Sequence, residues 1–339
     1  MTDVQTIAVI ADDEDIRLDR WFRRHFPELG HGPLEKMLRT GQIRIDGKRA
    51  KSSTRLVVGQ NIRVPPIGPA PAASSTSSGA PSKAWVEPEP DNHETDWLHD
   101  AILHMDDQVI AINKPPGLAV QGGTGIKRHL DGMLDALRFG LPDRPRLVHR
   151  LDKDTSGVLL LGRTPGSAAK LAEIFRTKEA RKTYWAITVG LPWPAQGRIN
   201  LAIGKGASGS SSDERMLVDG PGAKRAVTYY SVIEEASKRA AWIALRPITG
   251  RTHQLRVHCA AMGTPILGDG KYGAKEAFIN GVPGGKSLML HAREIEIRMP
   301  NRALLHVTAP LPDSMKKVWK FFEFNPDLKI DPFAKLEVK

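Results

Sequence analysis

The chain contains 339 residues, of which 40% are hydrophobic and 26% charged, a composition typical of a globular protein large enough for two domains. Its single cysteine, Cys259, excludes an internal disulfide and a thiolate cage for a metal, and no apolar run is long enough to cross a bilayer. The formal net charge of +11 indicates a polyanionic partner, and the first residues lack the pattern of a signal peptide, so we expect a cytoplasmic protein without membrane contact.

The positive charge is concentrated near the N-terminus. Residues 16–63 contain twelve Lys or Arg against four Asp or Glu, a net charge of +8. A basic, well-hydrated surface is the ordinary explanation for such a segment. Its concentration in one small unit favours binding to nucleic acid instead.

This N-terminal segment has the pattern of a compact α/β module. Two helices are predicted from apolar residues at helical spacing, and short strands are predicted at 43–45 and 62–64. The apolar positions are Leu18, Trp21, Phe22 and Phe26 in the first helix and Leu34, Met37 and Leu38 in the second. Pro27 would end the first helix, Pro33 fits the first turn of the second, and Gly41 fits its cap. We expect the aromatic residues to form the core rather than to stack on bases.

The order of these elements resembles the alpha-L RNA-binding domain, which presents basic helix faces to RNA phosphates. The resemblance implies an RNA-binding domain at residues 15–65. Its candidate phosphate contacts are Arg17, Arg20, Arg24, Lys36, Arg39, Lys48 and Arg49.

Pro, Ala, Ser and Gly dominate residues 66–95, which are predicted to be a disordered, flexible linker. A second domain is expected at 96–325, with a C-terminal tail at 326–339. Its predicted strands are 109–113, 158–163, 183–189, 226–233, 241–246 and 288–291, and its predicted helices are 127–139, 166–176, 252–262 and 313–322. This order predicts an α+β domain with a mostly antiparallel sheet, and 205–224 reads as a mobile loop.

One polar segment lies between two apolar runs of this domain. Residues 149–157 read His-Arg-Leu-Asp-Lys-Asp-Thr-Ser-Gly and place Asp152 among basic residues. Taken alone, this is a charged loop between two strands. The nine residues resemble the active-site motif of the pseudouridine synthases of the RluA, RluC and RluD family, which modify large-subunit ribosomal RNA. The resemblance implies a mixed sheet with a cleft across its middle, and Asp152 as the catalytic carboxylate.

Three further segments are similar to motifs of the same family. Asn113–Gly117 matches its first motif, although Gln121 stands where the RluC group usually has His. Lys182-Thr183-Tyr184 matches the motif whose aromatic ring lies against the target base, whereas without the resemblance Tyr184 reads as a core residue.

Residues 250–258, Gly-Arg-Thr-His-Gln-Leu-Arg-Val-His, match the third motif on a predicted helix. The resemblance implies that Arg256 pairs with Asp152. His253 and His258 could suggest a metal site, but their spacing puts them on different helix faces, so we predict no metal.

The implied chemistry breaks the bond from the sugar to the uracil nitrogen and remakes it to carbon 5, with no redox change, so no cofactor is predicted. Asp152 could attack the sugar, attack the base or remove a sugar proton, and the sequence leaves these roles open. In a dry cleft the charge of Asp152 needs a fixed cation beside it, and a permanently charged arginine such as Arg256 could supply it. Tyr184 would hold the flipped base, and Arg150, Leu255 and Lys182 complete the candidate base and RNA contacts.

We therefore predict a monomeric pseudouridine synthase acting on 23S ribosomal RNA of the large subunit or its assembly precursor. A catalytically silent RNA-binding assembly factor remains an alternative, because it would need the basic module and the fold but not Asp152, Tyr184 and Arg256. A hydrolase with Asp152 as nucleophile is a second alternative, which predicts further carboxylates for a metal, and only Asp154 is close in sequence.

Overall fold

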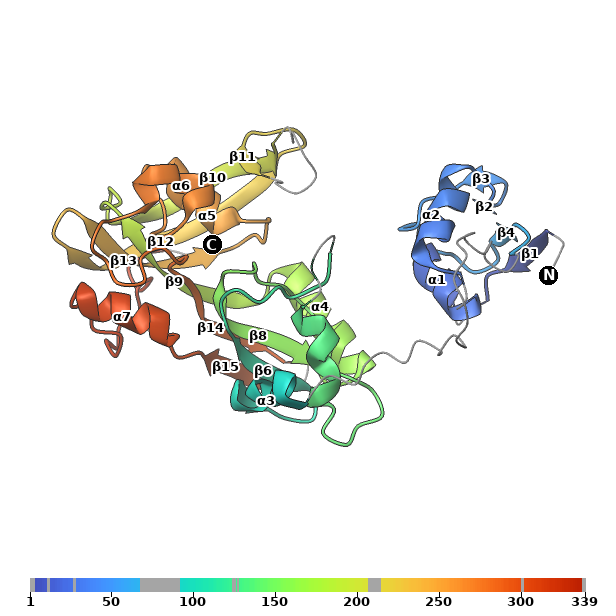
Figure 1. Ribbon diagram of the computed structural model, residues 1–339, viewed down its shortest axis with the longest axis horizontal. Coiled ribbons are helices and arrows are strands. Elements are labelled where there is room, and N and C mark those ends of the chain that lie inside the picture. Colours follow the sequence, from blue (N-terminus) through green and yellow to red (C-terminus); the bar gives the residue numbers. More distant parts are fainter. Residues whose placement is uncertain are drawn as a thin grey trace, which may run out of the picture. The chain divides into compact units, whose positions relative to one another are not determined.

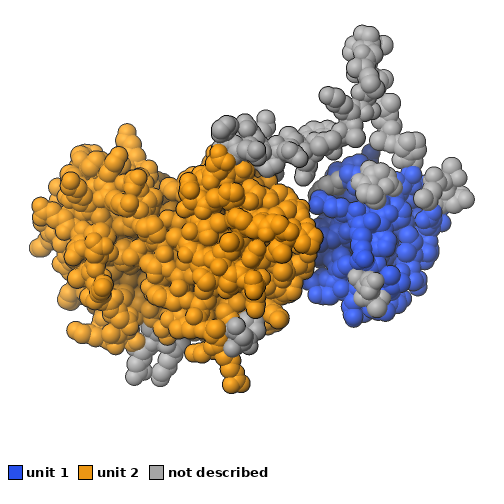
Figure 2. Space-filling view, turned by 90° about the horizontal axis from the view of Figure 1, so that it is seen from below, with its two compact units in different colours: residues 1–85 blue, residues 86–339 orange. Residues whose placement is uncertain are grey.

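The computed structural model describes residues 4–10, 13–26, 29–67, 92–123, 126, 128–206, 215–299 and 302–336. The chain forms two compact units, residues 1–85 and residues 86–339 (Figure 2). Within the described residues, no helix is both long and apolar enough to cross a membrane.

The first unit combines two helices with a small antiparallel sheet (Figure 1). Its elements are β1 (Gln5–Ala8), α1 (Leu18–His25), α2 (His31–Arg39), β2 (Arg44–Ile45), β3 (Lys48–Arg49) and β4 (Asn61–Val64). The strand order is β1-β4-β2-β3. Strand β1 was not predicted; it pairs with β4 and extends the unit to the N-terminal side of residue 15.

The core of this unit is aromatic, as the sequence predicts. Trp21 and Phe22 are fully buried, and Phe26 is nearly so. The buried carboxylate of Asp13 accepts hydrogen bonds from Trp21 Nε1 at 3.0 Å and Arg24 Nη1 at 3.0 Å, and it lies 2.9 Å from His25 Nε2. The aromatic side chains are therefore occupied by packing.

The second unit is built on one large sheet. Its strands are β5 (Ile102–Met105), β6 (Val109–Lys114), β7 (Arg146–Leu147), β8 (Ser156–Gly162), β9 (Arg181–Val189), β10 (Gln196–Lys205), β11 (Met216–Val218), β12 (Lys224–Ala236), β13 (Ala240–Pro247), β14 (Leu290–Arg298) and β15 (Leu304–Thr308). Its helices are α3 (Asn92–Asp100), the 3₁₀ helix η2 (Leu130–Leu137), α4 (Pro165–Thr177), α5 (Gln254–Ala261), α6 (Gly270–Gly273), the 3₁₀ helix η3 (Ala274–Ala277) and α7 (Asp313–Phe321).

The strand order is β11-β10-β12-β13-β9-β14-β8-β6-β5, with β15 beside β14 and β7 beside β8. Among the described strands, β14 and β8 form the one parallel pair, and the other pairings are antiparallel. The predicted α+β class with a mixed, mostly antiparallel sheet is confirmed.

Strands β6 and β8 are buried on both faces, which explains their continuous apolar sequences. Ile112 and Leu159 pack in a cluster with α3 and η2, whereas Val158 and Leu160 pack in a second cluster with α4 and β15. Successive side chains of a strand point to opposite faces, so both faces of such a strand must be apolar. The segment before β8, which carries Asp152, is therefore anchored at its C-terminal end to a rigid strand.

Gly157 allows β8 and β14 to approach each other closely. Its φ is +112°, and a Cβ built on it would lie 2.2 Å from the carbonyl oxygen of Ala292. No side chain fits this place without moving one of the strands.

Several local predictions differ from the structure or lie partly outside the described residues. The predicted helix 127–139 is the 3₁₀ helix η2, and the strand at 288–291 is the longer β14. The loop predicted at 205–224 includes β11, and its residues 207–214 lie outside the described residues. Most of the predicted linker, residues 68–91, also lies outside them, and α3 begins at Asn92 within its last part. Phe333 of the predicted tail is buried against β12 and β13.

Candidate active site

Strand register brings three distant motifs to the middle of the sheet. Ser156 at the start of β8 lies opposite His291, and the next residue of β14, Ala292, lies opposite Tyr184. Tyr184 is in turn opposite Leu245, close to the end of β13. The segment before β8, the ring of Tyr184 and the segment after β13 therefore converge.

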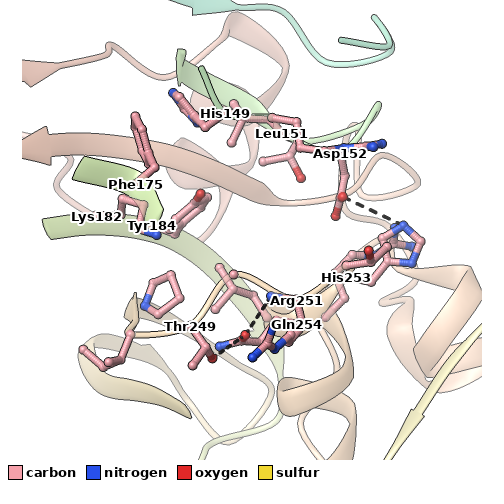
Figure 3. Close-up of a pocket in the computed structure, with 18 of the residues that line it drawn as sticks. His149, Leu151, Asp152, Phe175, Lys182, Tyr184, Thr249, Arg251, His253 and Gln254 are labelled. Carbon is pink, nitrogen blue, oxygen red and sulfur yellow. Dashed lines mark hydrogen bonds and ion pairs between the residues drawn. The ribbon is translucent and has the colours of Figure 1, made fainter. Parts of the chain in front are cut away.

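A pocket of about 410 Å³ occupies this place (Figure 3). Its volume lies within the usual range for small-ligand sites, about 300–1,000 Å³. All six site residues predicted in the second unit line it: Arg150, Asp152, Lys182, Tyr184, Leu255 and Arg256. Its wall also includes His149, Phe175 and the segment 247–254.

The loop that carries Asp152 is held by a buried lysine of the first motif. Lys114 is fully buried, and its Nζ donates hydrogen bonds to the carbonyl oxygens of Pro115 at 2.7 Å, Leu118 at 2.9 Å and Lys153 at 3.0 Å. Burial lowers the pKa of Lys114 to about 8, although nearby carboxylates, including that of Asp152, oppose this effect. Lys114 thus fixes the backbone directly after Asp152.

Asp152 itself reaches the pocket with about a quarter of its side chain exposed. The Tyr184 hydroxyl is buried nearby, and burial, followed by the charge of Asp152, raises the pKa of its phenol. Tyr184 therefore stays protonated at neutral pH and offers the pocket an uncharged aromatic ring. Burial also lowers the pKa of Lys182.

The predicted pairing of Arg256 with Asp152 is not what the structure contains. Arg256 forms a bidentate ion pair with Asp269, with Nε to Oδ2 at 2.8 Å and Nη2 to Oδ1 at 2.7 Å. The side chains of the two residues are 9% and 1% exposed. A carboxylate as deeply buried as Asp269 requires a cation, and it accepts hydrogen bonds from the Nε–Nη2 edge of Arg256. Burial opposes the charge of Arg256, but its hydrogen bonds with Asp269 and the charge of Asp269 raise its pKa, and the more distant charge of Asp152 adds to this effect.

The third motif is only partly helical, contrary to prediction. Helix α5 begins at Gln254, and His253 before it has a left-handed backbone with φ +53°. Arg251 and His253 therefore lie on the preceding turn. Gln254 Oε1 accepts hydrogen bonds from the Thr249 hydroxyl at 2.7 Å and from the Arg251 backbone N–H at 3.1 Å, which fixes this turn (Figure 3).

The predicted phosphate contacts of the first unit have different surroundings. Arg17 is paired with Asp19 at 2.7 Å, and Arg24 is paired with the buried Asp13. The other five are Arg20, Lys36, Arg39, Lys48 and Arg49, and all seven side chains are exposed. These exposed cations keep the surface of this unit basic.

The sequence did not single out Asp269, Lys114 or His253 as functional residues. His253 was considered only as a metal ligand, although it stands three residues before Arg256 in the same motif. Asp269 lies thirteen residues beyond Arg256, and only the fold brings the two together. Among the described residues, no group of three or more His, Cys, Asp or Glu could hold a metal ion. The pocket offers carboxylate and acid–base chemistry beside an aromatic ring.

Comparison with known proteins identifies the fold and its chemistry. The profile of the RNA pseudouridylate synthase family matches residues 108–261. The ribosomal large subunit pseudouridine synthase C of Rickettsia conorii is 37% identical over 281 residues, which cover 82% of this chain and 88% of that protein. The Vibrio parahaemolyticus protein of the same name is 31% identical over 328 residues, which cover 94% of this chain and 98% of that protein.

A solved structure agrees with these sequence relatives. The human RNA pseudouridylate synthase domain containing 4 has 32% sequence identity and a TM-score of 0.58, over 68% of this chain and 96% of that one. The resemblance noted in the sequence is confirmed. The chain belongs to the RNA pseudouridine synthases, in the group that contains the proteins named ribosomal large subunit pseudouridine synthase C.

Proposed function

We propose that this pseudouridine synthase isomerises uridines of 23S ribosomal RNA in the large subunit or its assembly precursor, with Asp152 as the catalytic carboxylate. The relatives named for the large ribosomal subunit support the substrate. The observation that carries the catalytic assignment is the meeting of Asp152 and Tyr184, from motifs far apart in the chain, in one pocket.

The pocket residues have distinct roles in this reaction. The target uridine leaves its stack and enters the pocket, which costs a few kcal/mol. Tyr184 stacks on the base and offsets about 1–3 kcal/mol of that cost. Asp152 acts on the sugar or the base while the glycosidic bond breaks, and Arg256, held by Asp269, supports its charge from a distance. Arg150, Lys182 and Leu255 contact the RNA around the base.

The first unit contributes affinity in this proposal. Its exposed cations, including Arg20, Lys36 and Arg39, contact RNA phosphates as in an alpha-L domain. The protein acts as a monomer in the cytoplasm and needs no cofactor. Light scattering would give a mass near 37.2 kDa for the free protein if it is monomeric.

The two alternatives differ from this proposal in measurable ways. A hydrolase with Asp152 as nucleophile would need further carboxylates for a metal, and the described residues contain no such cluster. A silent assembly factor would bind RNA without changing it.

The decisive experiment compares two matched variants of one loop. Forming a bond at carbon 5 of uracil expels the hydrogen at that position, so RNA labelled with tritium there reports turnover directly. We expect Asp152→Asn to fall below about one percent of wild-type turnover, a barrier increase of roughly 3 kcal/mol or more, with RNA affinity retained. The control Asp154→Asn removes an exposed carboxylate two residues away and should remain near wild type.

Turnover by Asp152→Asn above that level would overturn the catalytic assignment. An absence of tritium release by the wild-type protein on 23S ribosomal RNA and on its assembly precursors would overturn the substrate assignment. Mapping pseudouridines in ribosomal RNA from cells with and without the protein would identify the sites.

A further inference from the structure

A chain of polar contacts connects strand β11 with Asp152. The backbone N–H of Met216 donates to the Tyr272 hydroxyl at 3.1 Å, and that hydroxyl lies 2.6 Å from His253 Nδ1. On the other edge of the imidazole, Nε2 lies 3.9 Å from Asp152 Oδ1 (Figure 3). The four groups come from four separate parts of the chain.

The hydrogen bonds in this chain favour one tautomer of His253. The Tyr272 oxygen accepts a hydrogen bond from the backbone N–H of Met216. Among the described residues, the acceptor within reach of the Tyr272 hydroxyl hydrogen is Nδ1 of His253. A neutral imidazole that accepts on Nδ1 carries its hydrogen on Nε2. The ring therefore directs an N–H group toward the carboxylate of Asp152.

The backbone and the surroundings hold His253 in this orientation. It adopts the left-handed conformation, which is strained for a residue with a side chain, and Gln254 fixes the turn around it. The groups that act on the imidazole are Asp152, Arg256, Lys271 and Asp269, and burial is the largest influence on its pKa, which it lowers. At neutral pH the ring is therefore an uncharged donor. Backbone strain at such a place is a common feature of functional sites.

We propose that His253 is a positioning residue that holds Oδ1 of Asp152 through its Nε2–H and leaves Oδ2 free for the reaction. This inference rests on the proposed catalytic function of Asp152. The distance of 3.9 Å is longer than a hydrogen bond. Catalytic hydrogen bonds are often long in the free enzyme, and this one shortens when RNA fills the pocket.

Two substitutions at His253 separate this role from a structural one. In His253→Gln the amide nitrogen lies near the place of Nε2, so the donor toward Asp152 is retained. In His253→Asn the amide lies near the place of Nδ1, so the contact with Tyr272 is retained and the donor toward Asp152 is lost. Asn also suits the left-handed backbone better than Gln. A residue needed only for stability would thus tolerate Asn at least as well as Gln.

We expect His253→Gln to keep kcat within about threefold of wild type and His253→Asn to lower it about tenfold to a hundredfold, the effect of one hydrogen bond to a charged group. KM for RNA should change little in either variant. Equal values of kcat for the two variants, a higher value for Asn, or a change confined to KM would overturn the proposal.

A second pair of variants remains informative if His253→Asn folds poorly. Tyr272→Phe removes the hydroxyl that sets the tautomer, and it should lower kcat at least several-fold. In the His253→Ala background the same change should have almost no further effect, because the hydroxyl acts through the imidazole. Additive losses would overturn the proposal.

The outcome is separable from that of the proposed function. High turnover by Asp152→Asn would refute the function. If Asp152→Asn is inactive but the His253 or Tyr272 variants give one of the contradicting results described above, only the role of His253 is refuted.

Discussion

The partner of Arg256 can be determined from thermal stability. The sequence motif implies Asp152 as the partner, whereas the structure pairs Arg256 with Asp269 through two hydrogen bonds of 2.7 and 2.8 Å. The carboxylate of Asp269 is 1% exposed, so its pairing takes place away from water. Replacing Asp269 with Asn leaves a buried guanidinium without its counter-charge. Removing one partner of a buried ion pair destabilises a protein by about 3–5 kcal/mol.

This free energy corresponds to a large shift in Tm. For a unit of the size of residues 86–339, about 1 kcal/mol shifts Tm by roughly 2–4 °C, so Asp269→Asn should lower it by about 6–20 °C. Asp152→Asn should change Tm by no more than about 2 °C, because the Asp152 side chain is partly exposed and Arg256 does not depend on it. Circular dichroism of the free protein during heating measures both.

A third variant gives the internal control. Arg256→Lys retains the charge but cannot form both hydrogen bonds, so its Tm should lie between those of wild type and Asp269→Asn. Equal stability of Asp269→Asn and wild type, or a larger loss in Asp152→Asn, would show that the reasoning from the buried pair is incorrect.

Three further predictions follow from other features. Lys114→Met should lower the free energy of unfolding by about 3 kcal/mol, because three carbonyl groups lose their hydrogen-bond donor. It should also reduce kcat, because the loop that carries Asp152 loses its anchor. An unchanged kcat would refute the anchoring role. Burial lowers the pKa of His258 and of His291 to about 4, below the ordinary 6.5, so the unfolded chain takes up these protons first as pH falls. Stability present above pH 6.5 should therefore decline toward pH 4, by about 1.4 kcal/mol for each histidine at pH 5.5. Urea unfolding of His291→Gln should show a weaker decline than wild type. Deleting residues 1–90 should weaken RNA binding and flatten the dependence of log affinity on log salt, with turnover at saturating RNA within about tenfold of full length; an unchanged salt slope would mean that the basic unit does not touch RNA.

The fold class, the family and six of the residues that line the pocket could be predicted from the amino-acid sequence. Continuous apolar runs predicted β6 and β8, and helical spacing predicted α1 and α4. The motifs around Asp152 and Tyr184 are short contiguous strings, so their residue types can be read directly. Local patterns of this kind need no knowledge of distant partners.

The contacts between side chains that lie far apart in the sequence depend on the folded chain and could not be predicted. The register of β8, β14 and β9 sets the position of Tyr184 relative to the Asp152 loop, and no local pattern encodes it. Strand β1 was missed because its pairing with β4 is long-range. The helix predicted at 252–262 begins at Gln254, because His253 before it has a left-handed backbone. Arg256 binds Asp269 rather than Asp152 because the buried carboxylate lies within reach only once α5 and α6 have packed, and a buried charge must be neutralised by the nearest suitable cation.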